Sequence, residues 1–202
     1  DPMANNDTLL FATNAFLNFD AYDLINKKYI VRKLVLKNGS LTAKVSTDGK
    51  ENFNVFVPNN KPENKNFKFS LDQLNLKDFS LNYQNIPLRQ EYDFTISDSK
   101  LKGQFSNKEY DLNIISSMLV NKFYLEGINY ISSKNANTEI ILHVINDPFS
   151  LTIKKGKLKI GDMNFFLEGD YKSSKKDMLN LNIKGNQIQI SEIFSVLPLD
   201  YA

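Results

Sequence analysis

The feature that most constrains the fold is an alternation of apolar and polar side chains with a period of two residues. It is clearest between Leu34 and Phe56, where Leu41, Ala43 and Val45 alternate with threonine, lysine and serine. Successive side chains of a strand point to opposite faces of a sheet, so this period indicates strands with one buried face. Asn38-Gly39 lies between two such runs, and Asn-Gly is a strong signal for a tight hairpin turn. We therefore predict a hairpin here.

The same arrangement recurs along the chain, with apolar residues before a polar turn of four residues and a leucine after it. The predicted turns are Lys37–Ser40, Ser97–Lys100 and Lys154–Lys157, with a shortened version at Lys77-Asp78. In each full copy the last apolar residue before the turn and the leucine after it are five positions apart. This repetition favours a segment of a longer repetitive β array, although an ordinary antiparallel meander can also produce it by chance.

A strand followed by a helix N-cap occurs near both ends of the sequence. Asp20 precedes a helix predicted near Ala21–Asn26, and Ser191 precedes one predicted at Glu192–Leu197. The similarity of these two sequence patterns strengthens the case for internal repetition.

Together these patterns predict a mostly β chain, an elongated and strongly twisted antiparallel sheet of repeated hairpins with one or two short helices. We expect residues 1–202 to form a single β-rich segment of a longer protein. Residues 1–8 are expected to be disordered or tag-derived. Residues 58–66, with two prolines and four asparagines, are expected to form a flexible loop. Neither a signal peptide nor an apolar run of about 18 residues is present.

Composition narrows the classes of function. The net charge is only +2 and the chain has two arginines, Arg32 and Arg89, which argues against nucleic acid as a partner. The absence of cysteine excludes thiolate catalysis and cysteine-based metal sites. His143 is the single histidine, and its alternating strand context indicates a half-buried structural residue with one hydrogen-bond partner. We therefore predict no catalytic residues, no cofactor and no metal, and we expect that the protein is not an enzyme.

Aromatic residues are abundant, with 15 Phe and 9 Tyr, many of them in predicted strands. Core packing explains such residues in most β proteins. An apolar trough that holds acyl chains is the functional alternative. Several predicted strands, at residues 123–130, 140–145 and 163–167, carry apolar residues on both faces. Such strands need a second layer, a ligand or a partner to cover them.

Three stretches resemble a known family: Asp48–Phe53 (DGKENF), Phe69–Tyr83 and Leu179–Pro198. Through them, and from about Leu17 to Pro198 overall, the chain resembles the periplasmic portion of AsmA-like proteins, which are relatives of TamB among repeating β-groove lipid-transfer proteins. The N-terminal membrane anchor of that family is not in this sequence, which fits an excised segment. The loop at residues 58–66 is shorter than many of its equivalents.

The resemblance implies a protein of the Gram-negative envelope that projects into the periplasm from an inner-membrane anchor outside this chain. It implies a curved sheet with an apolar inner face. It also implies phospholipid movement between membranes or maintenance of outer-membrane integrity, without a catalytic residue set. Phospholipid and other envelope proteins are the expected partners.

We therefore predict that acyl chains contact apolar strand residues. The candidate lipid-facing residues are Phe69, Leu71, Phe79, Leu81, Phe94, Ile96, Phe123, Leu125, Phe165 and Leu167. Two alternatives stay open. One is a structural or assembly module that binds envelope proteins through its sheet edges and apolar face. The other is a carbohydrate-binding β module that uses exposed tyrosines.

Overall fold

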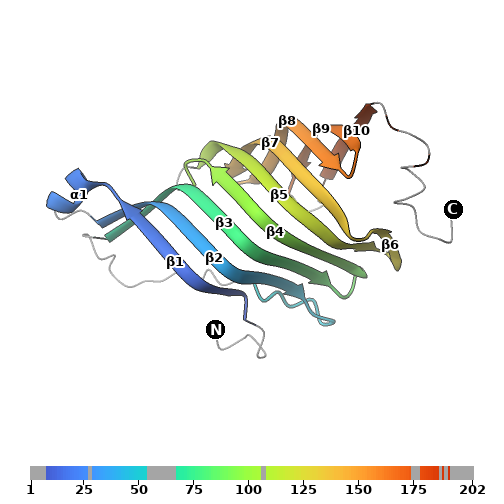
Figure 1. Ribbon diagram of the computed structural model, residues 1–202, viewed down its shortest axis with the longest axis horizontal. Helices are drawn as coiled ribbons and strands as arrows, with labels where there is room; N and C mark the ends of the chain where they lie inside the picture. The colour runs from blue at the N-terminus through green and yellow to red at the C-terminus, as the bar shows by residue number, and fades with distance from the viewer. Residues whose placement is uncertain are drawn as a thin grey trace.

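The computed structural model describes residues 8–26, 29–53, 67–105, 108–173 and 178–186, with the single residues 188 and 191. Most of them lie in one open, curved sheet (Figure 1). The elements are β1 (Leu10–Phe19), α1 (Ala21–Ile25), β2 (Tyr29–Val45), β3 (Phe67–Asn85), β4 (Gln90–Lys102), β5 (Glu109–Leu125), β6 (Ile128–Ile131), β7 (Lys134–Asn146), β8 (Phe149–Ile160), β9 (Met163–Lys172) and β10 (Met178–Asn186).

The sheet has ten strands, and nine of them follow the order β1-β2-β3-β4-β5-β7-β8-β9-β10. The tenth, β6, pairs only with the end of β5. The prediction of a mostly β chain with very few helices is confirmed. The prediction of an antiparallel sheet needs one correction. Strands β2 and β3 run parallel, with Tyr29 opposite Phe67 and Val45 opposite Asn85. The sheet is therefore mixed, and β1 and β10 are its two edges.

The predicted turns at Lys37–Ser40, Lys77-Asp78, Ser97–Lys100 and Lys154–Lys157 are wrong. Each lies inside one continuous strand, within β2, β3, β4 and β8 respectively. The chain is locally irregular there but does not reverse. The physical reason is that β2, β3, β4 and β8 each pair with a neighbour on both sides, and a reversal would break both ladders.

The irregularities in these strands are β-bulges and related kinks. Asn38 and Asp78 adopt positive φ angles of 52° and 50° in the middle of β2 and β3. The pairing of β4 with β5 shifts by one residue between Ile96 and Asp98, and that of β8 with β9 shifts between Ile153 and Gly156. Such insertions bend a strand and increase its local twist. The pairing of β2 with β3 also shifts, between Val31 and Lys33 of β2.

The strand predicted at residues 123–130 is also wrong, because the chain turns at Glu126-Gly127. Both residues have positive φ angles, 53° and 96°, as a two-residue hairpin loop of the primed type requires. The turn joins β5 to β6. Gly161-Asp162 forms the turn that joins β8 to β9, where Gly161 has a φ of 57°.

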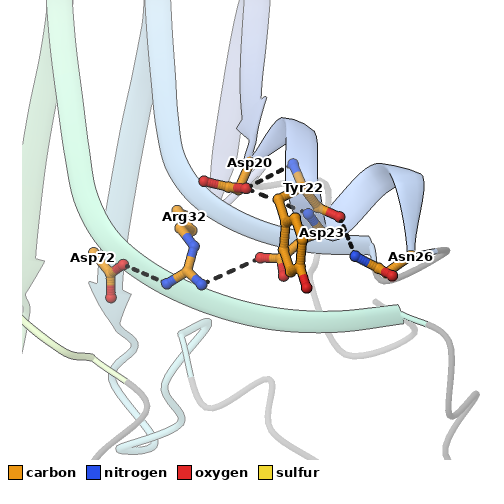
Figure 2. Close-up of polar contacts among 6 residues, drawn as sticks. All are labelled: Asp20, Tyr22, Asp23, Asn26, Arg32 and Asp72. Carbon is orange, nitrogen blue, oxygen red and sulfur yellow. Dashed lines mark hydrogen bonds and ion pairs between the residues drawn. The ribbon is translucent and has the colours of Figure 1, made fainter.

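Helix α1 follows its predicted cap. The Asp20 carboxylate accepts hydrogen bonds from the backbone N–H groups of Tyr22 (2.8 Å) and Asp23 (3.3 Å). Arg32 of β2 then bridges Asp23 of the helix (3.2 Å) and Asp72 of β3 (3.5 Å), as Figure 2 shows. The helix is thus attached to two strands.

Three predictions concern residues that the structure does not describe. They are the frayed start over residues 1–7, the loop at residues 58–66 and the second helix at residues 192–197.

Candidate functional site: an apolar sheet face

The bulges keep apolar residues on one face of the sheet. In an uninterrupted strand Leu36 and Leu41, five positions apart, would point to opposite faces. Both nevertheless contact the same buried cluster with Phe79 and Ile96, because the kink at Asn38 restores the phase. The odd spacing that the sequence repeats is therefore the signature of a bulge.

Asn38 and Gly39 have separate roles in this kink. Asn tolerates the positive φ at position 38 better than most residues. Gly39 is needed for space, because a Cβ atom there would lie 2.5 Å from the Phe79 ring and against the backbone of β1. The glycine therefore lets the Phe79 ring lie directly over β2.

Apolar side chains form one continuous surface from β1 to β9, which we call the apolar face. Two buried clusters make up its centre and share Met118 as a common neighbour. The strand register aligns one row across eight strands, which consists of Ala12, Gly39, Phe79, Ile96, Met118, Ala136, Ile160 and Met163. Exposure changes along this face. Phe79 is 1% exposed at the centre of the face, whereas Leu17 on the edge strand β1 is 50% exposed.

Within the described ranges every strand belongs to this one sheet, and α1 lies beyond the end of β1 (Figure 1). A sheet in water normally buries one face against a second layer. Here the described elements supply no such layer, so the apolar face is the main candidate for a binding surface.

Nine of the ten predicted lipid-facing residues have described side chains. Phe79 and Ile96 are buried in the first cluster, with Leu81 packed against it. Three more of the predicted residues, Phe94, Phe123 and Phe165, pack against the second cluster. Leu125 and Leu167 are half-buried and Leu71 is buried, all three outside these clusters, and the side chain of Phe69 is not described.

Sequence reasoning missed a part of this face. Leu34, Leu74 and Leu76 pack against the first cluster and Leu36 belongs to it, although none of the four is among the ten candidate residues. Leu158 packs against the second. The signal that could have found them is the odd spacing of leucines across each polar stretch.

Aromatic rings lie at both ends of the strands. At one end Tyr83, Tyr92 and Phe123 stack across β3, β4 and β5, with ring centroids 5.5 Å and 4.7 Å apart. Partial burial raises the pKa of the Tyr92 phenol, with a smaller contribution from Tyr83. At the other end Phe149 meets Tyr171 edge to face at 6.0 Å.

The opposite surface, which we call the polar face, carries most of the charged side chains. His143 lies there with two carboxylate neighbours, Asp111 at 2.9 Å and Glu109 at 3.1 Å, where the sequence predicted one partner. Lys154 contacts Asp111 at 2.7 Å. Hydrogen bonds from Lys154 and then His143 lower the pKa of the Asp111 carboxyl. Among the described residues, no three His, Asp or Glu side chains are placed to share a metal ion.

Two hollows lie on the polar face. The larger, about 450 Å³, has Asn137, Lys159, Asn164 and Asn186 among its lining residues. The smaller, about 190 Å³, lies over β2, β3 and β4 and includes Thr42. The smaller is lined mainly by amides and charged groups, whereas the lining of the larger also includes the exposed side chains of Ile115 and Phe166.

A line of polar groups follows the bulges across the sheet. Thr13 donates a hydrogen bond to the carbonyl of Asn38 at 2.9 Å. Ser97 donates to the carbonyl of Ser117 at 2.9 Å, and the Ser117 hydroxyl donates to Asn137 at 2.7 Å. Bulges aligned on neighbouring strands bend those strands together, which adds to the curvature of the sheet.

No helix within the described ranges has the length and apolar character needed to cross a membrane. Comparison of the chain with protein-family models, with curated proteins and with solved structures gave no match.

Proposed function

We propose that the apolar face binds the acyl chains of phospholipid, as a non-enzymatic segment of a lipid-handling protein of the bacterial envelope. One observation carries the proposal: an apolar surface is continuous across nine strands of a single sheet, with no second layer among the described elements. Exposed apolar patches mark sites for lipids, ligands or partners, and this face, whose central residues are buried, is open to solvent at its β1 edge, where Leu17 is 50% exposed.

The chemistry of the apolar face suits acyl chains. Its central clusters consist of aliphatic, aromatic and methionine side chains, which offer no hydrogen bonds to a polar ligand. Each methylene group that leaves water contributes about 0.8 kcal/mol to binding. Binding and release of this kind need no covalent step, which agrees with a chain that we expect to have no catalytic residues.

The resemblance to AsmA-like proteins supports the cellular setting of the proposal. The segment would lie in the periplasm of a protein anchored in the inner membrane by residues outside this chain. Phospholipid transport between membranes, or maintenance of the outer membrane, would then be its role.

The proposal is tested by lipid extraction and site-specific crosslinking. We expect phospholipid to copurify and to be detected by mass spectrometry of a solvent extract. A photoreactive phenylalanine at Leu81, on the apolar face, should form lipid adducts. The same group at Asn82, the next residue and on the opposite face, is the matched control and should form few. Absence of copurifying lipid with equal labelling at both positions would contradict the proposal.

An assembly module is the second candidate, and edge strand β10 favours it. All nine of its residues are exposed, and it pairs with β9 without a register shift. Regular, uncovered edges accept an added strand. Leu181→Pro would remove one backbone donor from this edge, because the adjacent Asn180 carbonyl faces β9 beside Gly169 and successive backbone groups alternate between the two sides of a strand. If envelope proteins bind there, the variant should lose them in a pull-down while its lipid content is unchanged.

A further inference from the structure

Helix α1 has the reverse of the usual amphipathic arrangement. Its hydrophobic side chains face solvent, with Tyr22 72%, Leu24 42% and Ile25 81% exposed. Its one acidic residue, Asp23, turns toward the sheet, and its side chain is only 13% exposed. A surface helix normally does the opposite. No residue of α1 is buried.

The arrangement is held in place by polar contacts. Five residues are too few for a helix to be stable alone in water. The Asp20 cap closes the first turn, and the Asn26 side chain donates to the Tyr22 carbonyl at 2.8 Å. Arg32 joins Asp23 to β2 and β3 (Figure 2). The contacts therefore present an ordered set of apolar side chains to solvent.

The sequence that surrounds α1 is basic. Between residues 20 and 33 it has four cations, Lys27, Lys28, Arg32 and Lys33, and the anions to set against them are Asp20, Asp23 and the second partner of Arg32, Asp72, which gives a net charge of +1 (4 − 3). Because Arg32 is paired with two of these aspartates, the excess positive charge comes from the lysines. A basic sequence beside exposed apolar residues suits an anionic surface.

We propose that α1 inserts Tyr22, Leu24 and Ile25 into the headgroup region of an anionic bilayer. The patch is too small for a protein interface, which typically takes about 20–30 residues a side, whereas a few aliphatic residues and a tyrosine suffice at a membrane surface. Helix α1 follows directly on β1, which is an edge strand of the sheet that carries the apolar face. The inference rests on the proposed function, because the contact brings one end of an acyl-binding face to a source of lipid.

The experiment uses the absence of tryptophan from the chain. Tyr22→Trp places a single indole on α1, and Tyr130→Trp places one at the opposite end of the sheet, where Tyr130 is 37% exposed on β6. With phosphatidylglycerol–phosphatidylethanolamine vesicles, emission of the Y22W protein should move to shorter wavelength and be quenched by brominated lipid. The Y130W protein should show neither effect.

Ile25→Ser in the Y22W background should bind the vesicles about tenfold more weakly, the factor expected when one aliphatic side chain no longer leaves water. Circular dichroism should be unchanged, because both positions are exposed. No shift in Y22W, or an equal shift in Y130W, overturns the inference. A shift that grows with protein concentration without vesicles also overturns it, in favour of self-association. If lipid still labels Leu81, the proposed function survives that failure.

Discussion

The two faces of the sheet share one backbone and differ in what their side chains do. On the apolar face Phe79 and Ile96 are almost completely buried within a single layer. On the polar face the ion pairs, such as Asp111 with Lys154, are close to half exposed. The apolar face stabilises the fold by removing apolar surface from water. The ion pairs of the polar face add little to the stability of the fold, because water screens their charges. The difference places the main source of stability on the same side of the sheet as the proposed acyl-binding surface.

The largest effect should come from the centre of the apolar face. Phe79→Ala should lower the free energy of unfolding by about 3–5 kcal/mol, because the ring is 1% exposed and its loss leaves a cavity. The matched control is Phe166→Ala, since Phe166 is 43% exposed and should cost less than about 1 kcal/mol. Denaturant titration measures both. Equal losses would show that the faces do not differ as we describe.

The next effect concerns the space above Gly39. Gly39→Ala should cost about 1–3 kcal/mol, because the added methyl group would meet the Phe79 ring and the backbone of β1. Ser40→Ala, the adjacent substitution on the opposite face, should change stability by less than about 0.5 kcal/mol. Thermal unfolding of the two variants side by side makes the comparison. A tolerated alanine at position 39 would contradict the close contact of Phe79 with β2.

Two adjacent serines should respond with opposite signs. The Ser116 hydroxyl is buried and has no hydrogen-bond partner in the described structure, so Ser116→Ala should be neutral or stabilising by up to about 1 kcal/mol. Ser117→Ala removes a hydrogen bond to Asn137 and should cost about 0.5–1 kcal/mol. Chemical denaturation of both variants measures whether each substitution raises or lowers the free energy of unfolding. Destabilisation by the first substitution would mean that its hydroxyl has a partner.

The smallest effect should be the pH dependence of the polar face. The pKa of Asp111 is lower than its ordinary value of 3.8. Its ion pairs therefore stabilise the fold fully above that value and are lost as pH falls through the lowered pKa. Asp111→Asn should melt slightly below the natural protein at pH 7, with the two curves converging below pH 3.8. Melting temperatures from pH 2 to 7 test this, and a constant difference across the range would refute it.

Much of the architecture followed from local patterns. The alternation around Leu41 and Val45 predicted strands correctly, and Asp20 predicted the start of α1. The candidate residues fell largely on one face, because period-two spacing assigns faces without reference to partners. The parallel pairing of β2 with β3 was not predictable, since it depends on contacts between residues far apart in the chain.

By itself, the sequence determined which side chains share a face within each uninterrupted stretch of strand, because alternation is a property of the extended backbone. Whether Asn38-Gly39 would be a turn or a bulge was decided only by the tertiary structure. A hairpin and a bulge both accept Asn at positive φ, so the local signal is the same. Pairing of β2 with β1 on one side and β3 on the other selects the bulge, since it retains backbone hydrogen bonds that a reversal would lose.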